Sequence, residues 1–369
     1  MVRSMIKEAK KRVVVAMSGG VDSSVAAALL KEIGYDVIGF SMQVWDYSNQ
    51  KDGESRSCCS HKDIYTARSV ADALKIPFYV FNLQEEFEKE VIDYFVTEYM
   101  KGRTPNPCVL CNQRLKFEIL LKRAIELKAD YLATGHHARI IHDDSRGSYL
   151  LYKGRDTDKD QSYFLFTLTQ ENMQRLLFPI GEFLKSNVRK KAKDLGLEVA
   201  GKKESQEICF IPDNNYRKFI MRKIGTNKIN SGKIVNNEGT ILGKHNGIHM
   251  FTIGQRRGLG IPASHPYYVL GFDLENNTVI VGGENDLFCK GLIAEDLNWI
   301  AFPTLETEID VSFKIRYRYK EAKAKVIPRD DGYVFVWFNE PQKAVTPGQA
   351  VVFYDGDVVL GGGWIKESI

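Results

Sequence analysis

The stretch Val13-Val-Val-Ala-Met-Ser-Gly-Gly-Val-Asp-Ser-Ser24 decides the fold of the first part of this chain. A β-branched apolar run ends at Met17, two glycines follow, and an Ala- and Leu-rich run begins at Val21. This order predicts a buried strand, a sharp turn and a helix. Glycines let the backbone turn tightly and approach a ligand, and the unpaired N–H groups that open the helix favour an anion such as phosphate. The glycine loop (residues 17–20) fits neither the Walker A pattern nor Gly-x-Gly-x-x-Gly.

Strands and helices alternate from this loop to about residue 134. We predict strands at Val13–Met17, Asp36–Met42, Phe78–Asn82 and Tyr131–Thr134, and helices at Val21–Ile33, Asp63–Leu74 and Leu115–Leu127. Such alternation is typical of a parallel α/β sheet, whose ligands bind beyond the C-terminal ends of the strands. Met42, Gly135 and His136 follow or end strands, so we expect them to share a crevice with the glycine loop.

The composition changes after about Lys203. Residues 228–283 are rich in Gly and Asn, and residues 292–369 alternate apolar and polar residues around the turn pairs Asp331-Gly332 and Asp355-Gly356. Those pairs predict hairpins, and a small barrel would hide the strand edges. We therefore predict an α/β domain over residues 1–214, a central mainly β linker domain over 215–284 and a C-terminal β-barrel over 285–369.

Length and composition fit a globular protein of two or three domains. The chain has 369 residues, 44% of them hydrophobic, and a net charge of +4. No apolar run approaches the roughly 18 residues that span a bilayer, so we expect a cytoplasmic protein with no membrane partner. Its six cysteines favour redox, metal or catalytic use over a disulfide framework, and the mild positive charge permits an acidic partner.

Two cysteine segments carry the next signal. In Thr104-Pro-Asn-Pro-Cys-Val-Leu-Cys-Asn112 the prolines favour an extended chain, and a helical pattern begins near Asn112. We therefore expect Cys111 close to a helix N-terminus, where the dipole favours a thiolate. Cys209 stands between apolar residues after a polar loop. The pattern Cys58-Cys-Ser-His61 is interpreted as loop structure rather than a metal site, and Cys289 as a packing residue.

The motifs together resemble one known family. Ser18–Ser23 resembles the pyrophosphate loop of the ATP-pyrophosphatase superfamily. With the Pro105-Asn-Pro-x-x-x-Cys-Asn112 stretch and the Cys209 segment, it resembles the tRNA-specific 2-thiouridylases over nearly the whole chain. Further matching stretches are Ala133-Thr-Gly-His136, Lys159-Asp-Gln-Ser162, Thr252-Ile-Gly-Gln255 and Ala344-Val-Thr-Pro-Gly-Gln349.

The resemblance implies a fold and an activity. The fold would be an adenine-nucleotide α-hydrolase-like α/β domain followed by two small mainly β domains, the last a tRNA-binding barrel. The activity would be ATP-dependent 2-thiolation of the wobble uridine in tRNAs of the Lys, Glu and Gln type. AMP would first be transferred to the C2 oxygen, with Mg²⁺ accompanying ATP, and a cysteine desulfurase or a sulfur relay protein would supply the sulfur.

The resemblance also implies residue roles. Cys111 would be the nucleophile and Cys209 the persulfide carrier, and the reaction would leave a disulfide between them. The residues expected to hold ATP are Ala16, Met17, Ser18, Gly19, Gly20, Val21, Asp22, Ser23, Met42 and Gly135. The target uridine would be bordered by Asn106, Pro107 and Cys108. The residues expected to contact tRNA are His136, Lys159, Asp160, Gln161, Arg316, Tyr317 and Gln349.

One position departs from the family pattern and opens an alternative. Many relatives carry an acidic residue where this chain has Cys108. Cys108, Cys111 and Cys209 could instead hold a [4Fe–4S] cluster with one open iron, a route that needs no persulfide. Two further alternatives are an ATP-pyrophosphatase acting on a small metabolite and a non-catalytic RNA-binding or iron–sulfur protein that merely retains the loop.

Two cation-rich stretches suggest RNA contacts. The alternation in Lys314-Ile-Arg-Tyr-Arg-Tyr-Lys320 predicts a strand with its cations on one face. The segment Lys185–Lys203 contains seven Lys and Arg residues and predicts a basic helix. Both patterns suit a phosphate backbone.

Overall fold

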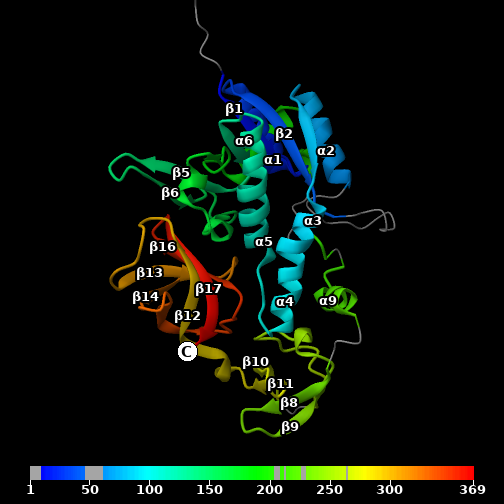
Figure 1. The fold of residues 1–369 in the computed structure, drawn as a ribbon, viewed down its shortest axis with the longest axis vertical. Helices are drawn as coiled ribbons and strands as arrows, with labels where there is room; N and C mark the ends of the chain where they lie inside the picture. The colour runs from blue at the N-terminus through cyan, green and yellow to red at the C-terminus, as the bar shows by residue number, and fades with distance from the viewer. Residues whose placement is uncertain (1–9, 46–60, 203–207, 212, 226–229, 263–264) are drawn as a thin grey trace, which may run out of the picture. The chain divides into compact units, whose positions relative to one another are not determined.

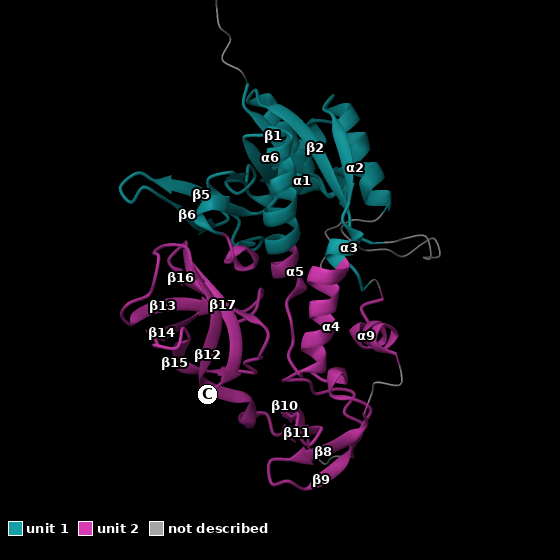
Figure 2. Cartoon of the chain, in the orientation of Figure 1, with its two compact units in different colours: residues 1–87, 112–162, 169–212 teal, residues 88–111, 163–168, 213–369 magenta. Residues whose placement is uncertain are grey.

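The computed structural model describes residues 10–45, 61–202, 208–211, 213–225, 230–262 and 265–369 (Figure 1). The chain forms two compact units. Unit 1 holds residues 1–87, 112–162 and 169–212, and unit 2 holds 88–111, 163–168 and 213–369 (Figure 2). The predicted central and C-terminal domains both fall in unit 2, which also takes residues 88–111 from the N-terminal part of the chain. In the described residues, no helix is long and apolar enough to cross a membrane.

Unit 1 is built on a five-stranded sheet in the order β3-β2-β1-β4-β7. Its strands are β1 (Arg12–Ala16), β2 (Asp36–Gln43), β3 (Phe78–Asn82), β4 (Tyr131–Thr134) and β7 (Leu176–Leu177). All neighbouring strands are parallel, and Val14 lies opposite Ile38 on one side and Leu132 on the other. The three valines of β1 are fully buried, as expected for a central strand covered on both faces. The predicted parallel α/β sheet is confirmed.

Helices α1 (Val21–Glu32), α2 (His61–Ala73) and α8 (Lys185–Asp194) pack in one apolar cluster with Val13 and Val15 of β1. A hairpin of β5 (Ala138–Asp143) and β6 (Ser148–Lys153) follows β4. The remaining short helices are α3 (Gln84–Phe87), α6 (Leu121–Glu126), α7 (Gln170–Met173) and η4 (Glu198–Gly201). Two further helices cross from one unit to the other along the chain, the π-helix η2 (Cys111–Leu120) and the 3-10 helix η3 (Ser162–Leu165).

Unit 2 contains a four-stranded sheet in the order β10-β11-β8-β9. These strands are β8 (Gly232–Asn236), β9 (Ile241–His245), β10 (Tyr268–Asp273) and β11 (Thr278–Gly282). The helices of unit 2 are η1 (Glu88–Ile92), α4 (Asp93–Met100), α5 (Pro107–Leu110), α9 (Tyr216–Ile224), η6 (Ile248–Met250) and η7 (Asn285–Leu287).

The C-terminal strands of unit 2 close into an antiparallel barrel. Six strands follow one another in the order β12-β15-β14-β13-β16-β17, and β12 also pairs with β17. They are β12 (Phe288–Trp299), β13 (Ile309–Lys314), β14 (Ala322–Pro328), β15 (Val334–Lys343), β16 (Ala350–Asp355) and β17 (Val358–Ser368). The predicted hairpins at Asp331-Gly332 and Asp355-Gly356 join β14 to β15 and β16 to β17. The predicted barrel is confirmed.

Two local predictions are wrong. The helix expected near Asn112 already begins at Pro107, because proline at the first helical position is preorganised for a helix. Cys108 therefore lies in the first turn, and Cys111 opens the π-helical stretch that follows. Lys314–Lys320 is not a strand with a cationic face: β13 ends at Lys314, and the chain then turns, with the Tyr319 N–H donating to the Arg316 carbonyl. The Arg316 guanidinium donates to the backbone carbonyl of Ala344.

Candidate functional site

The glycine loop connects β1 to α1 in a conformation that requires glycine. Gly19 has a φ of +68°, and a Cβ atom there would lie 2.2 Å from the carbonyl oxygen of Asp63. Both the left-handed conformation and the close approach exclude a side chain. Gly20 caps α1 with no side-chain hydrogen bond, so the first N–H groups of the helix keep their capacity to bind an anion.

Two buried serines fix the loop from the helix side. The Ser24 hydroxyl donates to the Gly20 carbonyl at 2.9 Å and the Ser23 hydroxyl to the same carbonyl at 3.2 Å. The backbone N–H of Ser18 in turn donates to the Ser23 hydroxyl at 3.2 Å. The loop is thus held by residues within one helical turn of it.

The end of β4 lies against this loop, as the sequence predicts. A Cβ atom at Gly135 would come within 2.5 Å of the Ser23 backbone nitrogen. In the sheet, β2 lies on one side of β1 and β4 lies on the other. The glycine loop that follows β1 therefore lies at the topological switch point of the sheet, which is where ligands of such folds bind. Met42 lies buried near the end of the neighbouring strand β2.

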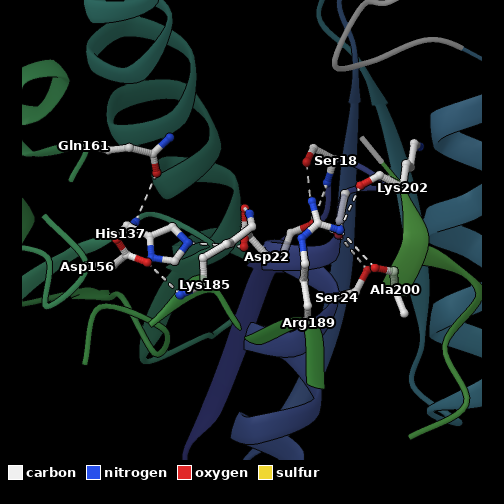
Figure 3. A network of polar contacts seen from close by, with 12 residues as sticks. Ser18, Asp22, Ser24, His137, Asp156, Gln161, Lys185, Arg189, Ala200 and Lys202 are labelled. Carbon is white, nitrogen blue, oxygen red and sulfur yellow. Dashed lines mark hydrogen bonds and ion pairs between the residues drawn. The ribbon is translucent and has the colours of Figure 1, made fainter. Parts of the chain in front are cut away.

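Asp22, in the first turn of α1, anchors a network of charged groups (Figure 3). Its carboxylate lies 2.6 Å from Nζ of Lys185 and 3.3 Å from Nε2 of His137. Burial alone would raise the pKa of Asp22, but the His137 hydrogen bond and the Lys185 charge together lower it. Asp22 is therefore a carboxylate at neutral pH. The Lys185 side chain is only 9% exposed, so this pair is largely shielded from solvent.

A second lysine holds the turn itself. Nζ of Lys202 donates to the Gly19 carbonyl at 2.8 Å and pairs with the carboxylate of Asp63 (Figure 3). Arg189 fixes this segment by donating to the carbonyls of Ala200 and Lys202. In the stretch Lys185–Lys203 these three cations therefore face the glycine loop or its supports, and not a solvent-exposed RNA surface as the sequence suggested. The sequence shows that this stretch is rich in cations, but it does not show where their side chains point.

Two residues expected to contact tRNA are buried in unit 1. Asp160 is 4% exposed, and its carboxylate accepts hydrogen bonds from the backbone of Gly154 and from Ser162. His136 lies against the rings of Phe117 and Phe178, and burial holds its pKa well below the ordinary value. Of their neighbours in the motif, Lys159 is half-buried, and Gln161 accepts a hydrogen bond from the His137 backbone at 3.0 Å.

The cysteine loop (residues 104–111) is attached to the C-terminal barrel within unit 2. The Thr104 N–H donates to the Pro347 carbonyl, and the Gln349 side chain donates to the Thr104 carbonyl, both at 2.8 Å. Gly348 has a φ of +87°, and a Cβ atom there would lie 3.0 Å from the Thr104 nitrogen. Gln349, expected to contact tRNA, thus supports the loop that carries Cys108 and Cys111.

Other predicted base- and tRNA-contacting residues gather at the same edge of the barrel. The hydroxyl of buried Tyr163 donates to the Ala350 carbonyl at 3.0 Å, and it also hydrogen-bonds the side chain of Asn106. The Tyr317 ring lies 6.4 Å from that of Tyr163, and Arg316 donates to the Thr346 hydroxyl at 3.0 Å. The structure brings together Asn106, Arg316, Tyr317 and Gln349. Tyr163, which the sequence did not indicate, contacts both Asn106 and the Tyr317 ring.

Cys111 and Cys209 belong to different units. Cys108 is exposed and Cys111 half-buried in unit 2; Cys209 is half-buried in unit 1. The segment after Cys209 is anchored by Phe210, which packs edge-on against Phe87 at 5.6 Å. Cys289 lies half-buried on β12. Cys58 and Cys59 lie outside the described residues.

Within the described ranges, no group of three or more His, Cys, Asp or Glu side chains is placed to hold a metal ion. This finding gives no support to the cluster expected as an alternative on Cys108, Cys111 and Cys209.

Comparison with known families divides the chain into three parts. Residues 11–213 match the model described as a tRNA methyl transferase HUP domain, and residues 217–283 match the tRNA methyl transferase PRC-barrel domain. Residues 289–365 match the aminomethyltransferase β-barrel domain. A solved 4-thiouridine synthetase–RNA complex with bound ATP covers 58% of this chain and is itself covered to 50%, at 17% identity and a TM-score of 0.36.

The sheet and its glycine loop define an α/β protein of the ATP-pyrophosphatase class. The tRNA-specific 2-thiouridylase MnmA of Geotalea uraniireducens is 57% identical over 369 residues, with 99% of this chain and 98% of that protein covered. The protein of the same name from Geobacter metallireducens is 55% identical, with 99% of each chain covered. This chain belongs to the tRNA-specific 2-thiouridylase family.

Proposed function

We propose that this chain is an ATP-dependent tRNA-uridine 2-sulfurtransferase that thiolates the wobble uridine. The observation that carries the proposal is the glycine loop, in which Gly19 has no room for a side chain at the turn that opens α1. Such a turn suits the pyrophosphate part of ATP. The C2 oxygen of uridine is a poor leaving group, and esterification with AMP turns it into a good one.

Asp22 supports the ATP half-reaction. Mg²⁺ prefers oxygen ligands and binds with one or two carboxylates together with phosphate oxygens, so the Asp22 carboxylate fits this ion. When bound, Mg²⁺ would neutralise charge on the departing pyrophosphate. Lys185 and His137 keep Asp22 ionised and oriented beside the loop.

The sulfur half-reaction uses both cysteines. A persulfide on Cys209, loaded by a donor protein, attacks C2 with its terminal sulfur, and AMP leaves. The Cys111 thiolate then attacks the Cys209 sulfur, which breaks the bond between that sulfur and the transferred one. The transferred sulfur stays on C2, a Cys111–Cys209 disulfide forms, and a dithiol reductant restores both thiols before the next turnover. Lys159, Gln161, Arg316, Tyr317 and Gln349 remain the predicted tRNA contacts.

The test is sulfur incorporation into an unmodified lysine tRNA transcript, run anaerobically with ATP and a persulfide donor. We expect 2-thiouridine at the wobble position, and AMP and pyrophosphate released only when tRNA is present. AMP release without tRNA would favour a small-metabolite substrate, and incorporation without ATP would contradict the proposal.

The same assay separates the persulfide from the cluster route. Full activity in an iron-free preparation supports the persulfide, because that route needs no iron. Activity that disappears with iron removal and returns on reconstitution would favour a cluster on Cys108, Cys111 and Cys209.

A further inference from the structure

An open pocket of about 550 Å³ lies in unit 2, between the start of α9 and residues 252–258. Tyr216 and Arg217 line it from α9, and Thr252, Gln255 and Arg257 line it from the loop. None of the described residues that line it is acidic. The pocket therefore carries two positive charges beside an aromatic ring, and neither the glycine loop nor the cysteine loop contributes to it.

Arg217 has unused hydrogen-bonding capacity. Its guanidinium lies 5.7 Å from the centre of the Tyr216 ring, and its buried Nε has no hydrogen-bond partner in the described part of the chain. Neither Arg217 nor Arg257 forms an ion pair with any carboxylate that the structure describes. Buried hydrogen-bond donors nearly always have an acceptor. The Arg217 guanidinium is therefore suited to an acceptor that comes from outside the chain.

The loop that carries Arg257 is held in one conformation. The Gln255 side chain accepts from the Thr252 N–H at 3.2 Å and donates to the Arg257 carbonyl at 2.9 Å. The backbones of Gly254 and Gln255 exchange two hydrogen bonds with Val269. The backbone that carries Arg257 is therefore held by hydrogen bonds within the loop and to β10, while the Arg257 side chain is exposed.

Tyr216 supplies a fixed aromatic wall. Its ring stacks on Tyr99 of α4, with centroids 4.7 Å apart and planes inclined by 27°. Two guanidiniums and a fixed ring, without a carboxylate, match a phosphate group next to a sugar or base.

We propose that this pocket binds a phosphate group of the substrate RNA, outside the wobble-uridine site. The inference rests on the proposed function for its choice of RNA. A free nucleotide such as AMP presents the same phosphate chemistry, and the experiment below has an arm for it.

The test compares the double variant Arg217→Met/Arg257→Met with the unchanged protein and with Arg329→Met. Arg329 pairs with Asp331 in a barrel hairpin and serves as the matched loss of a surface arginine. Binding of the lysine tRNA transcript is measured by fluorescence anisotropy at several salt concentrations, without ATP or sulfur donor. We expect the double variant to bind about 10-fold more weakly, with a slope of log K against log salt reduced by about 1 to 2, and Arg329→Met to bind normally.

Two further measurements complete the test. Thermal unfolding midpoints that are equal in Arg217→Met/Arg257→Met and the unchanged protein would exclude misfolding. Recovery of tRNA binding in Arg217→Lys/Arg257→Lys would show that the loss comes from charge. In the second arm, AMP is titrated into the Gly19→Ala protein with and without the arginine substitutions. AMP binding that depends on the arginines, with tRNA affinity unchanged, would assign the phosphate to a free nucleotide. Unchanged tRNA and AMP binding would overturn the proposal.

Because no arm requires turnover, failure of the proposed function is distinguishable from failure of this inference. A protein that binds tRNA through the two arginines but never thiolates it would contradict only the function.

Discussion

The glycine loop and the cysteine loop are stabilised over very different distances along the chain. The Gly20 carbonyl is held by Ser23 and Ser24, three and four residues away. The Thr104 carbonyl is held by Gln349, 245 residues away. The turn of the glycine loop is thus held first by its own neighbours, with Lys202 added from 183 residues away, whereas the cysteine loop is held by the assembly of unit 2. Substitutions should therefore affect one half-reaction without the other.

Gly19→Ala should have the largest effect. The new Cβ would clash with the Asp63 carbonyl at 2.2 Å and require a left-handed alanine. We expect tRNA-dependent AMP release to fall by at least about 100-fold, while tRNA affinity is retained. Isotopic pyrophosphate release measures the first quantity and anisotropy the second.

Gly34→Ala is the matched control for that substitution. Gly34 has a φ of +98° but open space around a Cβ atom, so its replacement costs backbone strain alone, on the order of 1 kcal/mol of stability. AMP release should stay normal. Equal losses in both variants would mean that strain, and not the close approach at Asp63, explains the requirement for glycine.

Lys185→Met should come next, with AMP release reduced by about 10- to 100-fold. Loss of the ammonium would leave Asp22 partly buried beside His137 and raise its pKa, so the acid limb of the pH–rate profile should move to higher pH. Lys191→Met, on the same helix and paired with exposed Glu32, should leave the profile in place. An unshifted acid limb in Lys185→Met would rule out Asp22 as the group that titrates there.

Gln349→Ala tests the other side of the comparison. Without the hydrogen bond to Thr104, the cysteine loop loses one of its attachments, and we expect thiolation to fall about 10-fold with the KM for ATP unchanged. The rate of Cys111 alkylation should change in parallel. Gln342→Ala, which removes a contact with Tyr319 on the same barrel, is the control. A changed KM for ATP in Gln349→Ala would show that the two loops are not separable.

His136 should give the smallest effect, on stability. Burial lowers its pKa in the folded protein, so below pH 6.5 the unfolded chain binds a proton that the folded one does not. The free energy of unfolding therefore decreases as pH falls below 6.5, by up to about 1.4 kcal/mol per pH unit. Urea midpoints between pH 7 and 5 should depend less on pH in His136→Gln than in the unchanged protein. Replacement of exposed His142 should not alter the slope.

The same contrast explains what could be predicted from the sequence. The strand, the glycine turn and α1 follow from residues that are adjacent in the chain, and their bounds were predicted within a residue or two. The Arg316 side chain bonds to Ala344 and Thr346, 28 and 30 residues away. Contacts this distant are not visible in the alternation of Lys314–Lys320, which wrongly suggested a strand. Lys185 and Lys202 were visible only as part of a charge run, because their partners Asp22 and Gly19 are more than 160 residues distant.

The interleaving of the two units has a consequence for biosynthesis. Residues 88–111 and 163–168 belong to unit 2, but most of that unit is translated last (Figure 2). Tyr163 leaves the ribosome 187 residues before Ala350, whose carbonyl its hydroxyl bonds. The segments beside the cysteines must therefore wait for the end of translation before they can be buried, so a chain that stops short of the barrel leaves the cysteine loop without its support.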